Sequence, residues 1–403
     1  MIEIEINELE TPFQPSNPVR PENFKGREEI IKKIIRYVPN ALKNEPQHFF
    51  LTGNKGMGKT SICDYVMDYV SYKYNMACAY VSNKGNDSVD ELASKILVSL
   101  LNEVPDESKI EKLKTWFGDH FTELEIIGTK FRFNVDKKKQ EHIKKDFLMY
   151  LSQSYEDLKK YYNGLFIIID DINGLSDSKQ FVDWYKQMAD TIFVDSNFSI
   201  PVYFLLAGYP EKFDSLVDLE LSFGRIFHYA NVGRLTDETI KEFYKYAYKT
   251  IDVTVDEDAL NLMTKYSSGI PLTMQQIGDS TFWNITSENI TAENAKQGIL
   301  DAANELRNKQ MRKTINRIKS RQYENILLKI ANKEIQSFTK KQLENLLSED
   351  EKTIINPFMD KMIKIELLKK IEDSYENTYE FKDNIYYTYY HIKSNEKKLE
   401  EQS

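Results

Sequence analysis

One short segment limits the possible folds of this 403-residue chain more than any other. It reads Gly53-Asn54-Lys55-Gly56-Met57-Gly58-Lys59-Thr60, the complete spacing of a phosphate-binding loop. The apolar residues 48–52 before it predict a strand, and the residues after Thr60 predict a helix. A lysine-bearing surface turn would explain the loop alone but not its place between these two elements. We therefore expect the chain to bind a nucleoside triphosphate.

Each residue type in the loop has a chemical reason. Glycines adopt backbone angles closed to other residues, so successive N–H groups can turn toward phosphate oxygens at the positive end of the following helix. Lys59 is expected to reach the β- and γ-phosphates of ATP, and the hydroxyl of Thr60 is expected to bind Mg²⁺. The residues predicted to contact the nucleotide are Gly53, Asn54, Lys55, Gly56, Met57, Gly58, Lys59, Thr60 and Ser61.

A second segment supplies the acidic half of such a site. Residues 165–169 are all apolar, which is typical of a strand covered on both faces, and Asp170 and Asp171 follow them. We assign Asp170 to magnesium and Asp171 to orienting or deprotonating the attacking water. Many relatives of this motif have the longer glutamate at the second position, which leaves slow hydrolysis open. A strand followed by a solvated turn would also explain the acidic pair taken alone.

Composition excludes several classes of protein. No run approaches eighteen apolar residues and the first residues are acidic, so we expect a cytoplasmic protein without a signal peptide or a membrane segment. Cys63 and Cys78 are too few for a disulfide framework and fit core packing. The net charge is −9, yet residues 305–342 hold eleven Lys or Arg and three Glu, a local charge of +8. Such a stretch is either a solvated helix face or a surface for phosphates or a partner.

Prolines and hydrophobic periodicity divide the chain into parts. Residues 1–22 predict an extended leader that we expect to lie along the first domain. In residues 23–235 helix and strand alternate, which predicts an α/β fold with a doubly wound parallel sheet. An insertion at about 113–145 predicts a hairpin over 123–135 and a charged helix start, as a packed decoration or as a contact with a partner or subunit. The remaining parts are a helical lid at 236–304 and a winged-helix-like domain at 305–396.

Further stretches resemble the AAA+ and STAND branch of phosphate-loop ATPases, particularly initiator-like (Orc/Cdc6-like) and archaeal-type ATPases that end in a winged helix. Residues 24–28, Phe-Lys-Gly-Arg-Glu, resemble the box that opens such domains, and the resemblance implies that Arg27 flanks the adenine. A plain helix start would explain the same residues. Residues 205–211 resemble the strand end called sensor 1, but Ala207 and Gly208 stand where the family has a polar residue.

The resemblance implies two more site residues. Residues 222–227 lie where the family has its arginine finger, so Arg225 would reach the nucleotide of a neighbouring subunit; a surface salt bridge is the alternative. Residues 268–272 resemble the G-x-P element of the STAND group, whose proline, here Pro271, would lie against the base from the lid. A C-cap glycine followed by an N1 proline would explain Gly269 and Pro271 without a ligand.

The C-terminal part fits a winged helix. Three carboxylates, Glu349 to Glu351, lie at the start of its third helix, where they would face phosphates, whereas the basic surface lies on earlier helices. Contact of residues 305–390 with duplex DNA and contact with a protein partner therefore both stay open. The predicted elements are helices at about 320–331, 339–347 and 352–366 and wing strands at 367–371 and 378–381.

The leading hypothesis is an ATPase that acts as a nucleotide-dependent switch. It would bind ATP or ADP with Mg²⁺ between the sheet domain and the lid, form a homo-oligomer through Arg225, and act on DNA or on a protein partner. The alternative is a nucleotide-gated scaffold that hydrolyses ATP weakly or not at all, in phage defence or mobile-element biology, which the departures at Asp171 and Ala207 favour slightly. A small-molecule kinase shares the loop, but the chain length and the C-terminal helical domains count against it.

Overall fold

The structure is a computed structural model that describes residues 10–15, 25–83, 88–104, 121–127, 130–135, 144–285, 287–335, 337–371 and 377–401. The chain divides into two compact units, which are described separately. The sheet unit consists of Arg27–Gly53 and Lys59–Val232. The helical unit consists of Met1–Gly26, Asn54–Gly58 and Gly233–Ser403.

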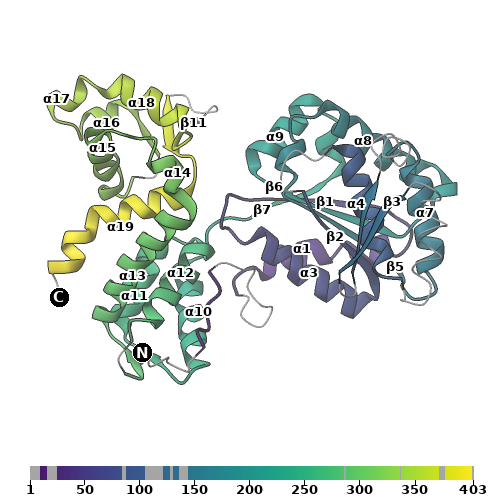
Figure 1. The fold of residues 1–403 in the computed structure, drawn as a ribbon, viewed down its shortest axis with the longest axis horizontal. Coiled ribbons are helices and arrows are strands. Elements are labelled where there is room, and N and C mark those ends of the chain that lie inside the picture. Colours follow the sequence, from purple (N-terminus) through teal and green to yellow (C-terminus); the bar gives the residue numbers. More distant parts are fainter. Residues whose placement is uncertain are drawn as a thin grey trace. The chain divides into compact units, whose positions relative to one another are not determined.

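The sheet unit contains the predicted parallel sheet. Its five strands lie in the order β2, β5, β6, β1, β7 and all pair in parallel (Figure 1). Strands β2, β5 and β6 lie on one side of β1 and β7 lies on the other, so the direction in which the chain crosses the sheet changes beside β1. Open α/β sheets bind ligands beyond the carboxyl ends of strands at such a point. The strands are β1 (Gln47–Thr52), β2 (Met76–Ser82), β5 (Gly164–Asp170), β6 (Val202–Gly208) and β7 (His228–Asn231).

Helices accompany the strands, as the alternating pattern predicts. Every residue of β5 and β6 is buried, which explains why both strands are mainly apolar rather than alternating, with Asp170 as the charged residue at the end of β5. The α-helices are α1 (Glu28–Ile35), α2 (Val38–Ala41), α3 (Lys59–Tyr74), α4 (Val89–Leu101), α7 (Phe147–Leu158), α8 (Lys179–Val194) and α9 (Pro210–Leu219). Short 3-10 turns are η2 (Ile172–Leu175), η3 (Ser196–Phe198) and η4 (Phe223–Ile226).

The insertion contains the expected hairpin, in which β3 (Phe121–Ile127) and β4 (Lys130–Val135) pair antiparallel. The charged helix start predicted at 136–145 lies mostly outside the described residues, which resume at Lys144. The Lys144 Nζ lies 3.0 Å from Asp90 on α4, and its carbonyl accepts a hydrogen bond from the Trp184 indole on α8. The C-terminal end of the insertion is therefore packed onto the sheet unit.

The helical unit begins with a bundle that matches the predicted lid. Thr236 and Thr291 accept hydrogen bonds from backbone N–H groups three residues later, so each starts a helix as a side-chain cap. No helix among the described residues could cross a membrane, because none is both long and apolar enough. The elements are α10 (Asp237–Lys249), α11 (Glu257–Ser267), α12 (Pro271–Phe282) and α13 (Ala292–Leu306), with short parallel strands β8 (Thr254–Val255) and β9 (Asn289–Ile290).

The leader does not lie along the first domain, and that expectation is wrong for residues 10–15. Phe13 is 2% exposed and packs edge-on against Phe243 and Tyr248 of α10 in the helical unit. A Cβ built on Gly278 of α12 would lie 2.3 Å from the Phe13 ring, so only glycine leaves room for the ring. The strand predicted from Ile2, Ile4 and Ile6 lies outside the described residues.

The predicted border between residues 304 and 305 falls inside α13 and is also wrong. The helix continues through a π-helical turn, η5 (Arg307–Met311), into α14 (Arg312–Ile315), so the chain has no linker there. The lid and the C-terminal part consequently belong to one compact unit.

The C-terminal part has a three-stranded antiparallel sheet in the order β10, β12, β11, consistent with a winged helix. The third helix is split, so the Glu349–Glu351 carboxylates lie on a separate turn, α17, and do not start α18. Strand β10 and the last helix, α19, were not predicted. The elements are α15 (Arg321–Asn332), β10 (Ser337–Thr339), α16 (Lys340–Glu344), α17 (Glu349–Lys352), α18 (Ile355–Lys364), β11 (Leu368–Ile371), β12 (Thr378–Phe381) and α19 (Asn384–Glu401).

Candidate nucleotide site at the carboxyl edge of the sheet

The predicted phosphate loop joins β1 to α3, and two of its glycines need their conformational freedom. Gly56 has φ +79° and Gly58 has φ +88°, a region that residues with a Cβ rarely adopt. The Gly56 carbonyl accepts a hydrogen bond of 3.2 Å from the N–H of Leu272 at the start of α12. A Cβ on Gly56 would also lie 3.0 Å from the Leu272 Cβ, so the loop and the G-x-P segment are in contact within the helical unit.

Gly53 has a different reason to be glycine. Its φ is not in the left-handed region, but a Cβ there would lie 3.0 Å from the Val232 Cβ and 3.1 Å from the Val232 carbonyl oxygen. The expectation that all three glycines serve special backbone angles is therefore wrong for Gly53. Close packing at the end of β1 requires this glycine.

Lys59 is the first residue of α3. Its ammonium group donates a hydrogen bond of 2.6 Å to the Gly53 carbonyl and lies 4.8 Å from the centre of the Tyr209 ring. The amino group is thereby held over the end of β1, on the same loop whose N–H groups are predicted to bind phosphate. A phosphate would replace a neutral carbonyl with a charged acceptor, which forms a stronger hydrogen bond with ammonium.

Thr60 and Asp170, predicted to share the magnesium ion, are brought together. The Thr60 hydroxyl donates to the Asp170 carboxylate over 2.8 Å, although the two residues come from α3 and from the end of β5. Asp170 is 5% exposed and also accepts from the Tyr80 hydroxyl of β2 (2.6 Å) and from the Asp171 N–H (2.9 Å). The buried carboxylate is thus fully hydrogen-bonded and fixed in orientation.

The charges at this edge suit a divalent cation. Burial, reinforced by the charge of Asp170, raises the pKa of the Tyr80 hydroxyl, so Tyr80 remains a donor at neutral pH. Burial also raises the pKa of Asp64, one turn of α3 beyond Thr60, and the charge of Asp170 adds to this effect. A cation between Thr60 and Asp170 would relieve this concentration of negative charge.

The donor set fits Mg²⁺, which takes one or two carboxylates, a hydroxyl, phosphate oxygens and several waters. Within the described residues, no group of three or more His, Cys, Asp or Glu side chains could hold a metal alone. An ion held by Thr60, Asp170, water and a nucleotide agrees with that finding, because the chain then supplies only two ligands.

Asp171 lies just beyond β5 in the left-handed conformation, with φ +57°. Its carboxylate accepts a hydrogen bond from the side-chain Nδ2 of Asn173, and the side-chain Oδ1 of Asn173 accepts from the Tyr209 N–H over 2.9 Å. Asn173 therefore links Asp171 to the end of β6. Gly208 is small for this reason, because a Cβ there would lie 2.9 Å from Ile172 and 3.4 Å from Asn173.

The sequence interpretation missed Tyr80 and Asn173. Both contact predicted site residues, and Asn173 brings a polar side chain to the strand end where Ala207 and Gly208 offer none. Asn173 could have been found as the polar residue two positions after the acidic pair. Tyr80 could not, because one tyrosine in a half-buried strand is usually a packing residue.

The nucleotide contacts assigned to Arg27, Arg225 and Pro271 stay predictions. Arg27 is 7% exposed at the start of α1, and burial lowers its pKa to about 10. Arg225 is exposed in η4 and forms no ion pair within the parts of the chain that the structure describes. Pro271 is the N1 residue of α12, and Gly269 before it has φ +73°, as the helix-boundary alternative expects.

The parallel sheet, the glycine loop after β1 and the Thr60–Asp170 contact together define a phosphate-loop nucleotide-binding fold. Residues 23–183 match the family model described as an AAA ATPase domain. No curated protein sequence is detectably similar to the chain.

Three solved structures are similar along nearly the whole chain, and at these identities they show the fold alone. A Walker-type ATPase of Pyrococcus abyssi is 16% identical with a TM-score of 0.57, covering 94% of this chain and 99% of that one. The ORC2 protein of Aeropyrum pernix in its ADPNP–ADP complexes is 10% identical, with a TM-score of 0.55 and coverages of 96% and 98%. Cdc6 of Pyrobaculum aerophilum is 12% identical, with a TM-score of 0.50 and 97% of each chain covered.

Proposed function

We propose that this protein is an ATP-dependent molecular switch that binds Mg·ATP at the sheet edge, hydrolyses it slowly, and self-associates. The hydrogen bond between Thr60 and Asp170 carries this proposal, because it aligns a hydroxyl and a carboxylate beside the phosphate loop. The solved ORC2 structure with ADPNP and ADP supports a nucleotide as the ligand of this fold.

Each residue of the candidate site would have a separate role in ATP binding and hydrolysis. Lys59 and the loop N–H groups would hold the phosphates, and Thr60 and Asp170 would hold Mg²⁺, which neutralises charge on the transferring phosphoryl group. Asp171 would orient the attacking water. Isothermal titration calorimetry with ATP, in Mg²⁺ and in EDTA, tests the binding step: we expect at least tenfold tighter binding with Mg²⁺. Equal affinity in both buffers would reject the metal site.

Slow hydrolysis has a specific structural support. The Asp171 carboxylate already accepts a hydrogen bond from Asn173, so it must exchange that bond or share its second oxygen to bind a water. The same observation favours the second candidate function, a nucleotide-gated scaffold that turns over little ATP. Single-turnover phosphate release separates the two, because the scaffold predicts bound ATP that stays intact over hours.

Self-association would use Arg225, whose exposed guanidinium could neutralise phosphoryl charge on a neighbouring subunit. We expect turnover per subunit to rise with protein concentration, and Arg225→Ala to abolish that rise while leaving the affinity of the monomer for ATP unchanged. Turnover that is independent of concentration in both proteins would make Arg225 a structural residue.

The output of the switch would be DNA or protein contact through the C-terminal part. Duplex DNA is supported by exposed cations that form no ion pair within the described residues: Arg312, Lys313, Arg317, Lys319 and Arg321. The acidic turn α17 is only weak evidence against DNA contact. Its Glu351 carboxylate already accepts hydrogen bonds from Lys329, over 2.5 Å, and from the N–H of Ser348, over 2.9 Å.

A salt titration of DNA affinity tests this output. Each neutralised phosphate releases counterions, so log K should fall against log salt with a slope near 0.9 per contact. Reversing Lys313, Arg317 and Arg321 to Glu should flatten that slope and leave ATP affinity unchanged. If no DNA binds at low salt in either nucleotide state, the partner of the switch is a protein.

A further inference from the structure

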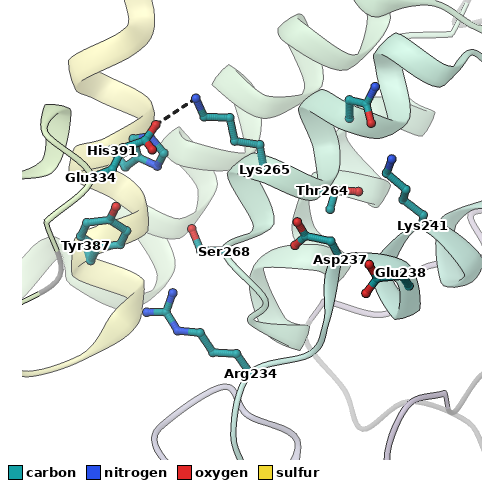
Figure 2. A pocket seen from close by; sticks show the side chains of 11 residues that line it. Arg234, Asp237, Glu238, Lys241, Thr264, Lys265, Ser268, Glu334, Tyr387 and His391 are labelled. Atoms are coloured by element: carbon teal, nitrogen blue, oxygen red, sulfur yellow. Dashed lines mark ion pairs between the residues drawn. The ribbon is translucent and has the colours of Figure 1, made fainter.

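A cavity of about 690 Å³ lies within the helical unit, outside the residues assigned to the nucleotide (Figure 2). Side chains from α10, from α11 and from α19 line it, and Arg234 and Glu334 complete it from the connecting segments. A volume of this size is typical of small-molecule sites. The cavity is therefore lined by both the lid helices and the last described helix of the chain.

Two buried side chains in this cavity have unused hydrogen-bonding groups. The Thr264 hydroxyl and both ring nitrogens of His391 are buried without a hydrogen-bond partner, and the two residues are 4% and 3% exposed. The Glu334 carboxylate oxygen lies 3.6 Å from the His391 Nε2, which is too long for a hydrogen bond. Burying such groups without partners is unfavourable. Because these atoms have almost no accessible surface, a ligand in the cavity would reach them after a small movement of the side chains and would then supply the partners.

One side of the cavity offers donors. Arg234 donates to the Asn384 side chain over 2.7 Å but forms no ion pair within the described residues, and its guanidinium points toward Tyr387 and Ser268 (Figure 2). Burial lowers the pKa of Arg234. A guanidinium is charged in proteins, so a half-buried positive charge lies there without an ion-paired carboxylate among the described residues. This is the environment that a carboxylate ligand requires.

The other side offers acceptors. Asp237 and Glu238 lie in the first turn of α10, and their carboxylates border the cavity. Lys265 is already neutralised by Glu334, at 2.9 Å, and Lys241 by Glu257, at 3.1 Å. Lys241 shares Glu257 with Lys245 and also acts on Glu238. Among the described residues, the lining groups that form no ion pair are the Arg234 guanidinium at one side and the Asp237 and Glu238 carboxylates at the other.

We propose that this cavity binds a small zwitterion of the amino-acid or short-peptide class, with its carboxylate on Arg234 and its ammonium group on Asp237 and Glu238. Thr264, Ser268 and His391 would read the polar atoms between these ends. His391 is suited to this, because burial lowers its pKa and the neutral ring both donates and accepts.

Binding would tie the lid to the winged-helix part. Asp237 belongs to α10 and Thr264 to α11, whereas His391 and Tyr387 belong to α19, so one ligand would contact all three helices. The ligand would act as an effector of the helical unit. This role does not depend on ATP binding at the sheet edge.

Thermal unfolding of the full chain tests the proposal, in a version whose only tryptophan is Trp283 of the helical unit, which serves as the fluorescent reporter. The probes are a pool of free L-amino acids and a pool of dipeptides, which separate the two sources of the zwitterion. Acetate, inorganic phosphate and putrescine carry only one of the two charges. A probe far above its Kd should raise the midpoint by about 2 °C or more, and the single-charge probes should not.

Variants then locate the binding site by calorimetry with the best probe. Arg234→Gln and Asp237→Asn should each weaken binding at least tenfold, and Thr264→Val, which keeps the side-chain shape, should weaken it several-fold. Lys249→Gln, an exposed lysine at the end of α10, is the control and should bind normally. No shift with either pool, an equal shift with acetate or phosphate, or normal binding by Arg234→Gln would overturn the proposal.

Discussion

The sheet edge and the cavity of the helical unit treat their buried polar groups in opposite ways. At the sheet edge, Asp170 accepts hydrogen bonds from Thr60, Tyr80 and Asp171, so the site is complete before a ligand arrives. In the cavity, Thr264 and His391 are buried with no hydrogen-bond partner. At the sheet edge, hydrogen bonds within the chain hold the metal-binding side chains in position. In the cavity, the polar atoms of Thr264 and His391 can form hydrogen bonds only with a ligand or water.

This difference predicts how each region responds to mutation. A hydrogen-bonded residue leaves its partner unsatisfied when it is removed, and that partner then bears a desolvation cost of about 1–3 kcal/mol. Removing a residue that has no hydrogen-bond partner leaves no other group unsatisfied.

Lys59→Ala should weaken ATP binding about 100-fold, because it removes the only side-chain cation assigned to the phosphates. Binding of the zwitterion probe should not change, since Lys59 belongs to the sheet unit. Calorimetry with each ligand measures both effects. Lys73→Ala, at the exposed end of the same helix, is the matched control, and a folded Lys59 variant with the affinity of the control would reject the phosphate loop as the nucleotide site.

Acid should destabilise the sheet unit through His48, whose Nδ1 lies 2.9 Å from the Tyr185 hydroxyl. Burial, followed by the charge of His228, lowers the pKa of His48 to about 3. The unfolded chain, with a pKa near 6.5, therefore binds the proton more tightly, so this stability is complete above pH 6.5 and falls as the pH drops.

The loss should be at most about 1.4 kcal/mol per pH unit, or roughly 2 kcal/mol between pH 6.5 and 5. Urea unfolding followed by Trp184, which belongs to the sheet unit, measures it. His48→Gln keeps a polar side chain without a titrating ring and should flatten the dependence. An equal acid slope in the variant would show that other groups cause the loss.

Asp170→Asn should weaken ATP binding about tenfold, and Asp171→Asn should slow turnover about tenfold. Asp170→Asn removes the charge that faces Thr60, so the part of ATP affinity that depends on Mg²⁺ should fall. Asp171→Asn should keep that affinity and slow phosphate release, since only the water-orienting group changes. Paired binding and turnover assays decide this, and equal effects of the two substitutions would contradict the separate roles.

The sequence predicted the sheet edge well because its signals are local. Eight contiguous residues define the loop, and an apolar run that ends in Asp170 defines the strand, so the Thr60–Asp170 contact follows from parallel strand topology. The strand predicted at 48–52 and the apolar run at 165–169 agree with β1 and β5 within one residue at each end, whereas α7 and α8 were not predicted. Local pattern also predicted the winged-helix elements, apart from β10, α19 and the split between α17 and α18.

The cavity could not be predicted, because it has no spacing to recognise. Arg234, Thr264 and His391 are separated by 30 and 127 positions and meet only through the packing of α19 against the lid. The docking of Phe13 on α10 was missed for a similar reason, since a lone phenylalanine in a proline-rich leader predicts no partner. Contacts between distant segments depend on tertiary packing, which local periodicity does not encode.

Thr60→Val and Thr264→Val make the same chemical change at the two regions, and their small effects should have opposite signs. At the sheet edge, valine removes a donor to the buried Asp170 carboxylate, so the sheet unit should lose about 1 kcal/mol. In the cavity, valine replaces a hydroxyl that has no partner with a methyl group of similar shape, so the helical unit without a ligand should lose nothing or gain up to about 1 kcal/mol.

Single-tryptophan versions of the chain keep the two measurements apart, because Trp184 reports the sheet unit and Trp283 the helical unit during urea unfolding. Thr264→Ser is the control: it restores the hydroxyl but loses the methyl group, so it should be less stable than Thr264→Val. If Thr264→Val destabilises the helical unit by as much as Thr60→Val destabilises the sheet unit, then the Thr264 hydroxyl has a hydrogen-bond partner in solution, and a bound water is the simplest one. In that case the cavity is hydrated in its resting state, and the zwitterion would have to displace that water, with a correspondingly lower affinity.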